Sequence, residues 1–310
     1  MSTPADPKAT IEATPARGAS FEKRRTTIAW LFLLPTLVVV GFIALYPLVQ
    51  TFYLSFTNAR LGTGEPTAFV GAQNYVDLAR DSYFHDAVLL TVLFTVVTVL
   101  SELALGLAIA LIVNSQFKGR STVRAAMLIP WAIPTVISAQ MWKWMYSDVY
   151  GVFNDILVNR LHVVDRNIAF LADPDLSFWA VALIDIWKTT PFMALLLLAG
   201  LQLVPGDLYE AARVDGATAL QQFTRITLPL LKPSLLVALI FRTLDALRVF
   251  DVFYVMFGNR PDMQTMATYA QQTLVSISDI GYGSAISVAL FLVIAVFIMI
   301  YLAVFRAEEA

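Results

Sequence analysis

The chain has 310 residues, a net charge of −2 and no cysteine, which excludes disulfides and thiolate metal sites and gives no sign of a nucleic-acid partner. Its two histidines, His85 and His162, are too few and too far apart for a histidine metal site, so no metal site is predicted. Hydrophobic residues make up 58% of the chain and charged residues only 14%, against about 25% charged in soluble domains. These proportions predict an all-α protein of the lipid bilayer, because the chain has too few polar groups to cover a water-exposed surface.

The first 26 residues differ in composition from the rest. They are rich in Ala, Thr, Pro and charge, and no short apolar segment among them ends in a small-residue cleavage site. This pattern is not that of a signal peptide. We interpret residues 1–26 as a disordered cytosolic N-terminal tail.

Residues 27–306 form the predicted transmembrane domain, followed by a short cytosolic C-terminal tail at 307–310. A helix needs about 20 apolar residues to cross the bilayer core, since each residue rises ~1.5 Å. Pro130 and Pro134 interrupt the third of the qualifying stretches and predict a kink, which serves either packing or a flexible joint for gating. Six stretches are long enough, which predicts six transmembrane helices: 27–55, 86–113, 123–146, 178–201, 234–257 and 284–305.

The distribution of Lys and Arg predicts the orientation of these spans. Basic residues gather in the loops on the side of the N-terminus, although the loops on the other side are longer. Because basic loops stay in the cytoplasm, we predict a multi-pass protein of the plasma or inner membrane with both termini cytoplasmic. The residues on the predicted inner side are Lys23, Arg24, Arg25, Lys118, Arg120, Arg124, Arg213, Arg225, Lys232 and Arg306.

The loop at 204–233, between the fourth and fifth predicted spans, is unusual. It reads as two short helices with a bend at Gly216, whose backbone freedom allows a turn. Asp207 and Glu210 have the spacing of a capping box for the first helix. The loop is either an ordinary connector or a docking helix whose small side chains enter a groove on another protein. Two prolines are expected to end the second helix before the fifth span: Pro229 and Pro233.

The order Glu210-Ala-Ala, Asp215-Gly-Ala and Ile226-x-Leu-Pro resembles the cytoplasmic signature of permeases in binding-protein-dependent ABC importers. The resemblance implies the type I ABC importer permease fold, in which this loop carries a coupling helix that sits in a cleft of the ATP-binding subunit. The ATPase-coupling residues that it implies are Glu210, Ala211, Ala212, Asp215, Gly216, Ala217, Leu228 and Pro229.

Three further segments resemble the carbohydrate branch of these permeases, near the maltose and trehalose permeases. They are Phe32-Leu-Leu-Pro, Leu128-Ile-Pro-Trp-Ala-Ile-Pro and Phe250-Asp-Val-Phe-Tyr; Gly258-Asn-Arg-Pro departs from the glycine pair that relatives usually have. The resemblance implies a small carbohydrate as solute, with a disaccharide such as trehalose or maltose as the first choice. It also implies the partners: a second homologous permease, two ATP-binding subunits that hold ATP and Mg, and an extracytoplasmic sugar-binding protein.

Ionisable residues lie inside the fourth and fifth predicted spans. Each costs about 2.5–3.5 kcal/mol at mid-bilayer on insertion scales, so such residues face a bundle interior or a wet cavity. Asp185/Lys188 and Asp245/Arg248 are spaced i,i+3, so each pair lies on one helix face. Two interpretations stay open: structural ion pairs that join helices, or a polar cavity that hydrogen-bonds sugar hydroxyls.

Resemblance to the maltose permease implies which residues contact the sugar in the second interpretation. The first group lies around Trp187-x-x-x-Pro191, and the second lies on the span after the coupling loop. The implied substrate-binding residues are Asp185, Lys188, Thr189, Phe192, Arg242, Asp245, Ala246 and Val249.

Several motifs are absent from the sequence. No Gly-x-x-x-x-Gly-Lys-Ser/Thr phosphate loop occurs, so ATP hydrolysis is expected in separate subunits and no cofactor is predicted in this chain. No zinc-protease motif, nucleophile elbow or Cys/His cluster occurs, so no catalytic residue is predicted and a membrane enzyme is disfavoured. Two transport alternatives remain: a secondary transporter driven by an ion gradient, and an ABC permease for a solute other than sugar.

Overall fold

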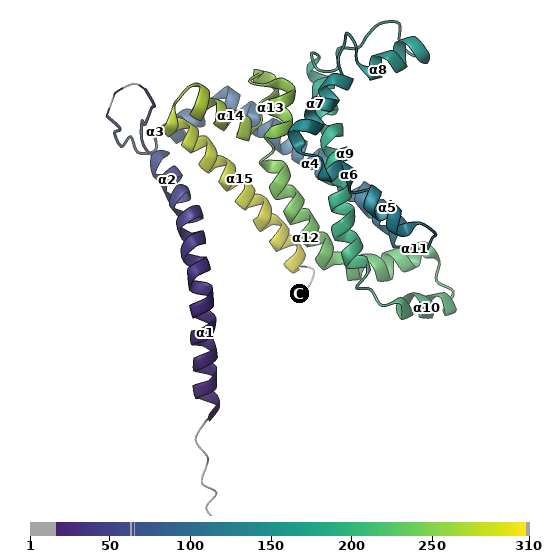
Figure 1. The fold of residues 1–310 in the computed structure, drawn as a ribbon. Coiled ribbons are helices and arrows are strands. Elements are labelled where there is room, and N and C mark those ends of the chain that lie inside the picture. Colours follow the sequence, from purple (N-terminus) through teal and green to yellow (C-terminus); the bar gives the residue numbers. More distant parts are fainter. Residues whose placement is uncertain (1–16, 63, 65, 308–310) are drawn as a thin grey trace, which may run out of the picture. The chain divides into compact units, whose positions relative to one another are not determined.

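The structure is a computed structural model that describes residues 17–62, 64 and 66–307. The described residues are mainly helical and contain no β-strand beyond two isolated bridges, which confirms the all-α prediction. The chain divides into two compact units, Met1–Gln50 and Thr51–Ala310, and each is described by itself. Figure 1 labels their helices.

The described part of the first unit is one long helix. It comprises α1 (Arg17–Val40) and a π-helical turn (Gly41–Leu45), and continues into α2 (Tyr46–Leu54). Residues 17–26 are therefore helical, and the prediction of disorder is wrong for this part of the tail. The segment contains Ala, Glu, Lys and Arg, which favour helix. The prediction for residues 1–16 lies outside the described residues.

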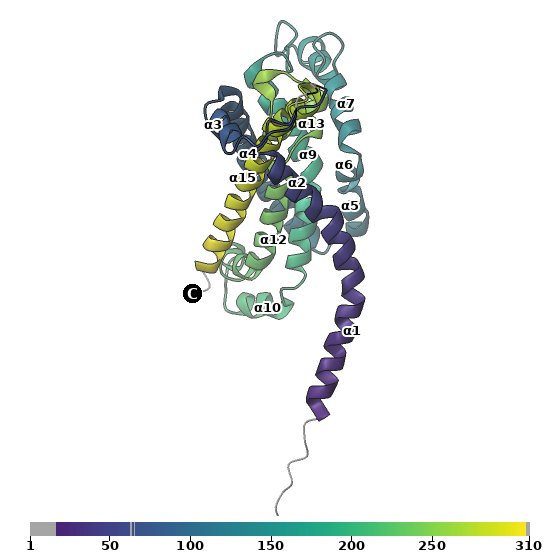
Figure 2. The same ribbon diagram turned by 90° about the vertical axis from the view of Figure 1, so that its left-hand side faces the viewer.

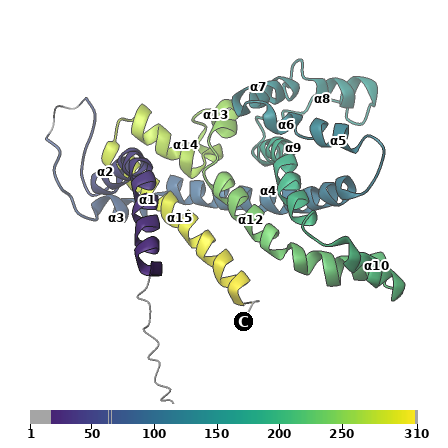
Figure 3. The same ribbon diagram turned by 60° about the horizontal axis from the view of Figure 1, so that its bottom comes forward.

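Three helices form the centre of the second unit: α4 (Ser82–Asn114), α9 (Pro174–Leu201) and α12 (Leu228–Leu247). α4 crosses α9 and α12 and packs against both (Figure 3). A side chain at Gly106 would place its Cβ 2.7 Å from Met193 Cγ and 3.1 Å from the backbone nitrogen of Ala194. Glycine at this position therefore permits the close approach of α4 to α9.

The third predicted span is broken rather than gently kinked. α5 (Arg120–Ala126) and α6 (Ile129–Ala132) meet α7 (Thr135–Met145) at an angle of 85°. Ile133 has extended backbone (φ −72°, ψ 132°), the conformation that a following proline imposes on its neighbour. The predicted bend at Pro134 is confirmed, and it is sharper than expected.

The fifth predicted span, 234–257, is also broken, so that prediction is wrong in its extent. α12 ends at Leu247, and α13 (Asp251–Phe257) begins after a short non-helical segment. Among the described residues, four helices are long and apolar enough to cross a membrane, or five if the bent pair counts as one. α12 is not among them, because its 20 residues include Lys232, Arg242 and Asp245. The count of six is therefore not confirmed.

The 204–233 loop contains α10 (Gly206–Val214), α11 (Ala219–Gln222) and a π-helical turn (Phe223–Thr227) that leads into α12. In Figures 1 and 2, α10 lies at the opposite end of α9 and α12 from α13. Gly216 has a φ of +76°, which confirms the predicted turn.

Two details of this loop differ from the prediction. α10 has Pro205 as its N-cap residue and no side-chain cap, whereas the capping box of the loop is formed by Thr218 and Gln221. Pro229 and Pro233 do not end a helix: they lie in the first two turns of α12.

Asp81 joins three elements at the start of α4. Its Oδ1 accepts a hydrogen bond from the Tyr83 backbone (2.9 Å), and its Oδ2 accepts bonds from the hydroxyls of Tyr269 (2.5 Å) and Tyr282 (2.7 Å). Partial burial raises the pKa of the Asp81 carboxyl, but these hydrogen bonds outweigh it and hold the pKa below its ordinary value.

The remaining α-helices are α3 (Gln73–Leu78), α8 (Val152–Asn154), α14 (Met266–Gln271) and α15 (Ile280–Ala307).

Candidate functional site

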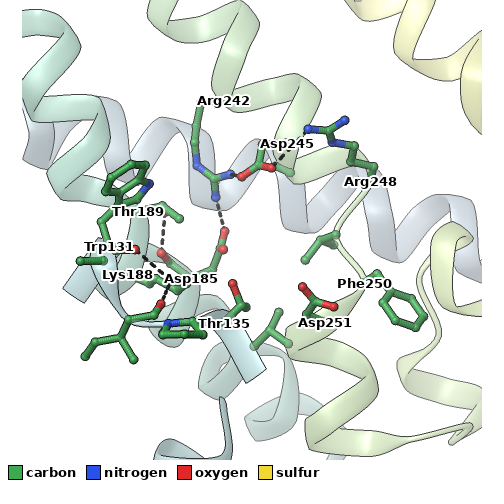
Figure 4. A pocket seen from close by; sticks show the side chains of 16 residues that line it. Trp131, Thr135, Asp185, Lys188, Thr189, Arg242, Asp245, Arg248, Phe250 and Asp251 are labelled. Atoms are coloured by element: carbon green, nitrogen blue, oxygen red, sulfur yellow. Dashed lines mark hydrogen bonds and ion pairs between the residues drawn. The ribbon is translucent and has the colours of Figure 1, made fainter. Parts of the chain in front are cut away.

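A cavity of about 490 Å³ lies between the break in the third predicted span, α9 and the segment that joins α12 to α13 (Figure 4). Its wall includes residues 131–135, which the break at Pro134 turns toward it, and residues 248–252, which comprise the second break and the first two residues of α13. Both helix breaks therefore shape the same cavity.

The structure brings seven of the eight predicted substrate residues to this cavity. Phe192 is the exception: its ring stacks on the ring of Trp131 (centroids 5.5 Å apart, planes at 10°), and Trp131 lines the cavity. The predicted residues on the wall are Asp185, Lys188, Thr189, Arg242, Asp245, Ala246 and Val249.

Arg242 is the centre of a buried charge cluster. Its Nη1 donates to Asp245 Oδ2 (2.9 Å) and its Nη2 to Glu102 Oε1 (2.9 Å). It also donates to Glu102 through Nε and to Asp185 through Nη2. Thr189 Oγ1 donates to the same Glu102 Oε1 (2.6 Å). Four of the five guanidinium N–H groups therefore meet carboxylate oxygens.

Burial makes these bonds decisive for the stability of the helix packing. The side chains of Glu102 and Arg242 are 0% and 2% exposed. A buried charge costs several kcal/mol unless it is paired and hydrogen-bonded. Because Glu102, Asp185 and Arg242 come from α4, α9 and α12, the cluster joins the three central helices.

Lys188 does not pair with Asp185, although the two share a helix face. Its Nζ donates to the carbonyl oxygens of Ile133 (2.6 Å) and Trp131 (3.3 Å). The break at Pro134 leaves these carbonyls outside a continuous helix, and the lysine supplies a donor. Lys188 thus connects α9 to the broken third span.

The second predicted site, the 204–233 loop, is open. α10 contains no buried residue, and Val214 and Leu220 are largely exposed. The Tyr209 and Thr227 hydroxyls lie 2.9 Å apart in a hydrogen bond that ties α10 to the start of α12. Among the predicted coupling residues, five are exposed (Glu210, Ala211, Asp215, Gly216 and Pro229) and three are half-buried (Ala212, Ala217 and Leu228).

Residues 102–308 match the family described as binding-protein-dependent transport system inner membrane component. The chain belongs to this family. The permease is 45% identical over 284 residues to the trehalose/maltose transport system permease protein MalF of Thermococcus litoralis, covering 91% of this chain and 95% of that protein. It is 42% identical over 284 residues to the sulfoquinovosyl glycerol transport system permease protein SmoG of Agrobacterium fabrum, covering 91% of each.

A solved structure shares the fold of the permease. It is a chain of a bacterial ABC transporter that imports the acidic polysaccharide alginate, with a TM-score of 0.79, 23% identity, and coverage of 93% of this chain and 98% of that one. The predicted ABC importer permease fold is thereby confirmed. Family membership also makes the chain a transport component of the inner membrane, which excludes the membrane-enzyme alternative.

Sequence reasoning missed Glu102, the carboxylate that binds Arg242 from the side of α4. A signal was present, because Glu102 is the only charged residue between Asp86 and Lys118. A single ionisable residue in a long apolar helix indicates a polar partner inside the bundle. The permease therefore holds its cavity arginine with a residue that does not itself line the cavity.

Sequence reasoning also left Trp131 without a role. Trp131 is 47% exposed and lines the cavity of the permease, and its ring stacks on the ring of Phe192. The Trp131 ring is therefore a flat apolar surface beside the charged groups. Such a surface suits the face of a sugar ring, whose C–H groups are apolar.

Proposed function

We propose that this permease forms, together with a second homologous permease, the translocation pathway of an ATP-driven importer for a small carbohydrate. A disaccharide such as trehalose or maltose is the solute that we favour. The observation that carries this proposal is the charge balance of the cavity wall. Three basic side chains (Lys188, Arg242 and Arg248) face three acidic ones (Asp185, Asp245 and Asp251).

This balance suits a neutral solute that is rich in hydroxyl groups. Each hydroxyl can donate one hydrogen bond and accept two, so it needs both kinds of partner. The exposed ring of Trp131 adds a stacking surface. The names of the two relatives, which concern a disaccharide system and a sugar-glycerol system, support a carbohydrate.

The loop at 204–233 is proposed to couple the permease to ATP hydrolysis. Its exposed α10, with Glu210 and the small residues that follow, would sit on one of two ATP-binding subunits, which hold ATP and Mg. This assignment places the loop and both termini in the cytoplasm, in agreement with the surplus of Lys and Arg on that side. An extracytoplasmic binding protein would deliver the sugar to the opposite side.

The proposal is tested by a pull-down of the tagged chain in mild detergent, with the Glu210→Lys variant as the comparison. The eluate is assayed for ATPase activity with a panel of neutral disaccharides and one sulfonated sugar glycoside. We expect an ATPase and a second permease to co-purify with the normal chain, and a neutral disaccharide to stimulate ATP hydrolysis.

Three results would change the assignment. Stimulation by the sulfonated glycoside alone would mean an anionic solute. A chain that elutes alone and still transports in liposomes would favour a secondary transporter driven by an ion gradient. Co-purification of the ATPase with the Glu210→Lys variant would contradict the role of the 204–233 loop.

A further inference from the structure

The break between α12 and α13 places two charged side chains on the cavity wall that are not among the substrate-binding residues implied by the family resemblance. Arg248 and Phe250 have non-helical backbone (φ −102°, ψ 21° and φ −129°, ψ −61°). The chain therefore leaves the α12 axis after Leu247 and re-enters a helix at Asp251. Both Arg248 and Asp251 line the cavity.

These two side chains differ from the other charges of the wall in how little they are engaged. The Arg248 guanidinium is 68% exposed and has one ion pair, a long one of 3.8 Å to Asp245. The Asp251 carboxylate is exposed, and no hydrogen bond or ion pair joins it to the described residues. In Figure 4, Asp251 stands apart from the Arg242 cluster, with no dashed line to any labelled residue.

Hydrogen bonds and ion pairs within the chain do not explain these two side chains. Asp251 is in the first turn of α13, where the helix dipole favours an acidic residue, but its carboxylate makes no capping hydrogen bond. A surface charge often belongs to an ion pair, but Arg248 and Asp251 do not pair with each other. Their polar atoms instead border a cavity of about 490 Å³ in a chain with few charges.

A donor with one long ion pair and an acceptor without one, close together in the chain, match the chemistry of a hydroxylated solute. A carboxylate accepts only, and a guanidinium donates only, so together they serve both functions of sugar hydroxyls. Hydrogen bonds to charged groups are also the stronger kind. Arg242, by contrast, already donates four of its five N–H groups within the chain, so it has one left for a ligand.

We infer that Arg248 and Asp251 contact the carried sugar directly and determine which sugar is carried. Asp251 accepts a hydrogen bond from one sugar hydroxyl, and Arg248 donates to another. Arg242 and Glu102 then serve mainly to hold α4, α9 and α12 around the cavity. This inference rests on the proposed function, since it names the residues by which the same cavity selects its solute.

The test measures uptake into liposomes by the assembled importer with saturating, sugar-loaded binding protein. It compares the disaccharide that the normal chain carries with its monodeoxy and monofluoro analogues. Because every permease variant receives sugar from the same binding protein, the preference of that protein cancels in the ratio of variant rate to normal rate.

We expect Asp251→Asn to lower uptake of the unmodified disaccharide about tenfold, because the neutral amide oxygen accepts a weaker hydrogen bond than the carboxylate does. One analogue lacks the hydroxyl that Asp251 contacts. For this analogue, the uptake rates of the variant and the normal chain should agree within about twofold, because the sugar no longer has the group with which Asp251 interacts. A fluorine accepts but does not donate, so fluorine at that position should act like the deoxy form.

Arg248→Gln should change the uptake ratio at a different hydroxyl position of the sugar. At that position the normal chain should transport the fluoro analogue better than the deoxy analogue, because the sugar atom there accepts a hydrogen bond from Arg248. The matched control is Asp155→Asn, an exposed carboxylate that pairs with Arg160 (2.9 Å) and does not line the cavity. Its uptake should stay within about twofold of normal for every sugar, as for an ordinary surface substitution.

The outcomes separate this inference from the proposed function. If the normal importer carries no sugar, both are overturned. If it carries a disaccharide but Asp251→Asn lowers the rate of every analogue by the same factor, or lowers none, only the inference is overturned. A ratio that changes for one analogue alone supports it.

Discussion

The buried charge cluster and the 204–233 loop use charged residues in opposite ways. In the cluster, Glu102 and Arg242 are almost completely buried, and their polar atoms meet partners from other helices of the same chain. In the loop, α10 buries no residue, and Glu210 and Asp215 face outward. Charges that are fully paired within the chain hold its own fold together. Charges and apolar side chains left exposed on a short helix are available to another subunit.

The largest expected effect tests the structural half of this comparison. Glu102→Ala removes two acceptors of Arg242 and one of the two acceptors of the Thr189 hydroxyl, which also donates to the Asp185 backbone carbonyl. We expect it to lower the free energy of unfolding by about 3–5 kcal/mol, since it leaves a buried guanidinium short of partners. Thermal unfolding of the purified protein in detergent measures the loss.

The control for Glu102 is one turn away on the same helix. Thr98 is buried, and its hydroxyl has no hydrogen-bond partner among the described residues. Thr98→Ala should therefore cost only about 1 kcal/mol, the typical value for a point substitution. Equal losses for the two variants would mean that packing, not the charge cluster, explains the effect.

Glu210→Lys tests the second part of the comparison, the exposed 204–233 loop. The side chain is exposed, so the unfolding temperature should not change, whereas binding of the ATP-binding subunit should weaken by at least about 2 kcal/mol through reversed charge at the interface. Uptake should disappear. Co-purification and uptake are measured together, with Asp207→Lys on the same helix as the control. Equal loss in the control would show that α10 responds to net charge rather than to the signature position.

Asp245→Ala lies between the two cases, because this residue belongs to the cluster yet is 59% exposed. Arg242 keeps its bonds to Glu102 and Asp185 in this variant, so the loss of stability should not exceed about 1 kcal/mol, as for an exposed ion pair. Uptake should fall while assembly stays intact. A loss of assembly would instead place Asp245 among the structural ion pairs.

The smallest effect concerns how firmly α10 is held. Tyr209→Phe removes the hydrogen bond to Thr227 and should cost about 1 kcal/mol, the net value of such a bond. Amide hydrogen exchange in α10 should become faster. Tyr254→Phe, which removes a hydroxyl with no hydrogen bond to the described residues, is the control. Unchanged exchange in the Tyr209 variant would show that other contacts fix the helix.

Much of this architecture is local and could be predicted from the sequence. Apolar runs predict membrane helices, Pro134 predicts a bend and Gly216 predicts a turn, because each depends on the residue itself and its near neighbours. The same holds for the 204–233 loop as a separate pair of short helices. The resemblance to the maltose permease implied eight cavity residues, and seven of them reach the wall. Six of the seven lie on α9 and α12, where their spacing places them on one face of each helix.

What the tertiary structure decided is the pairing of distant groups. Glu102 and Arg242 are 140 residues apart, and nothing in either segment alone indicates the other. Spacing on one helix predicted Asp185 beside Lys188. In the structure, Asp185 instead accepts a hydrogen bond from Arg242, and Lys188 donates to the carbonyls of the broken third span. The break that exposes Arg248 and Asp251 was likewise not predicted. Hydropathy and helical spacing describe one helix at a time, but the partner of a buried charge is set by which helices pack together.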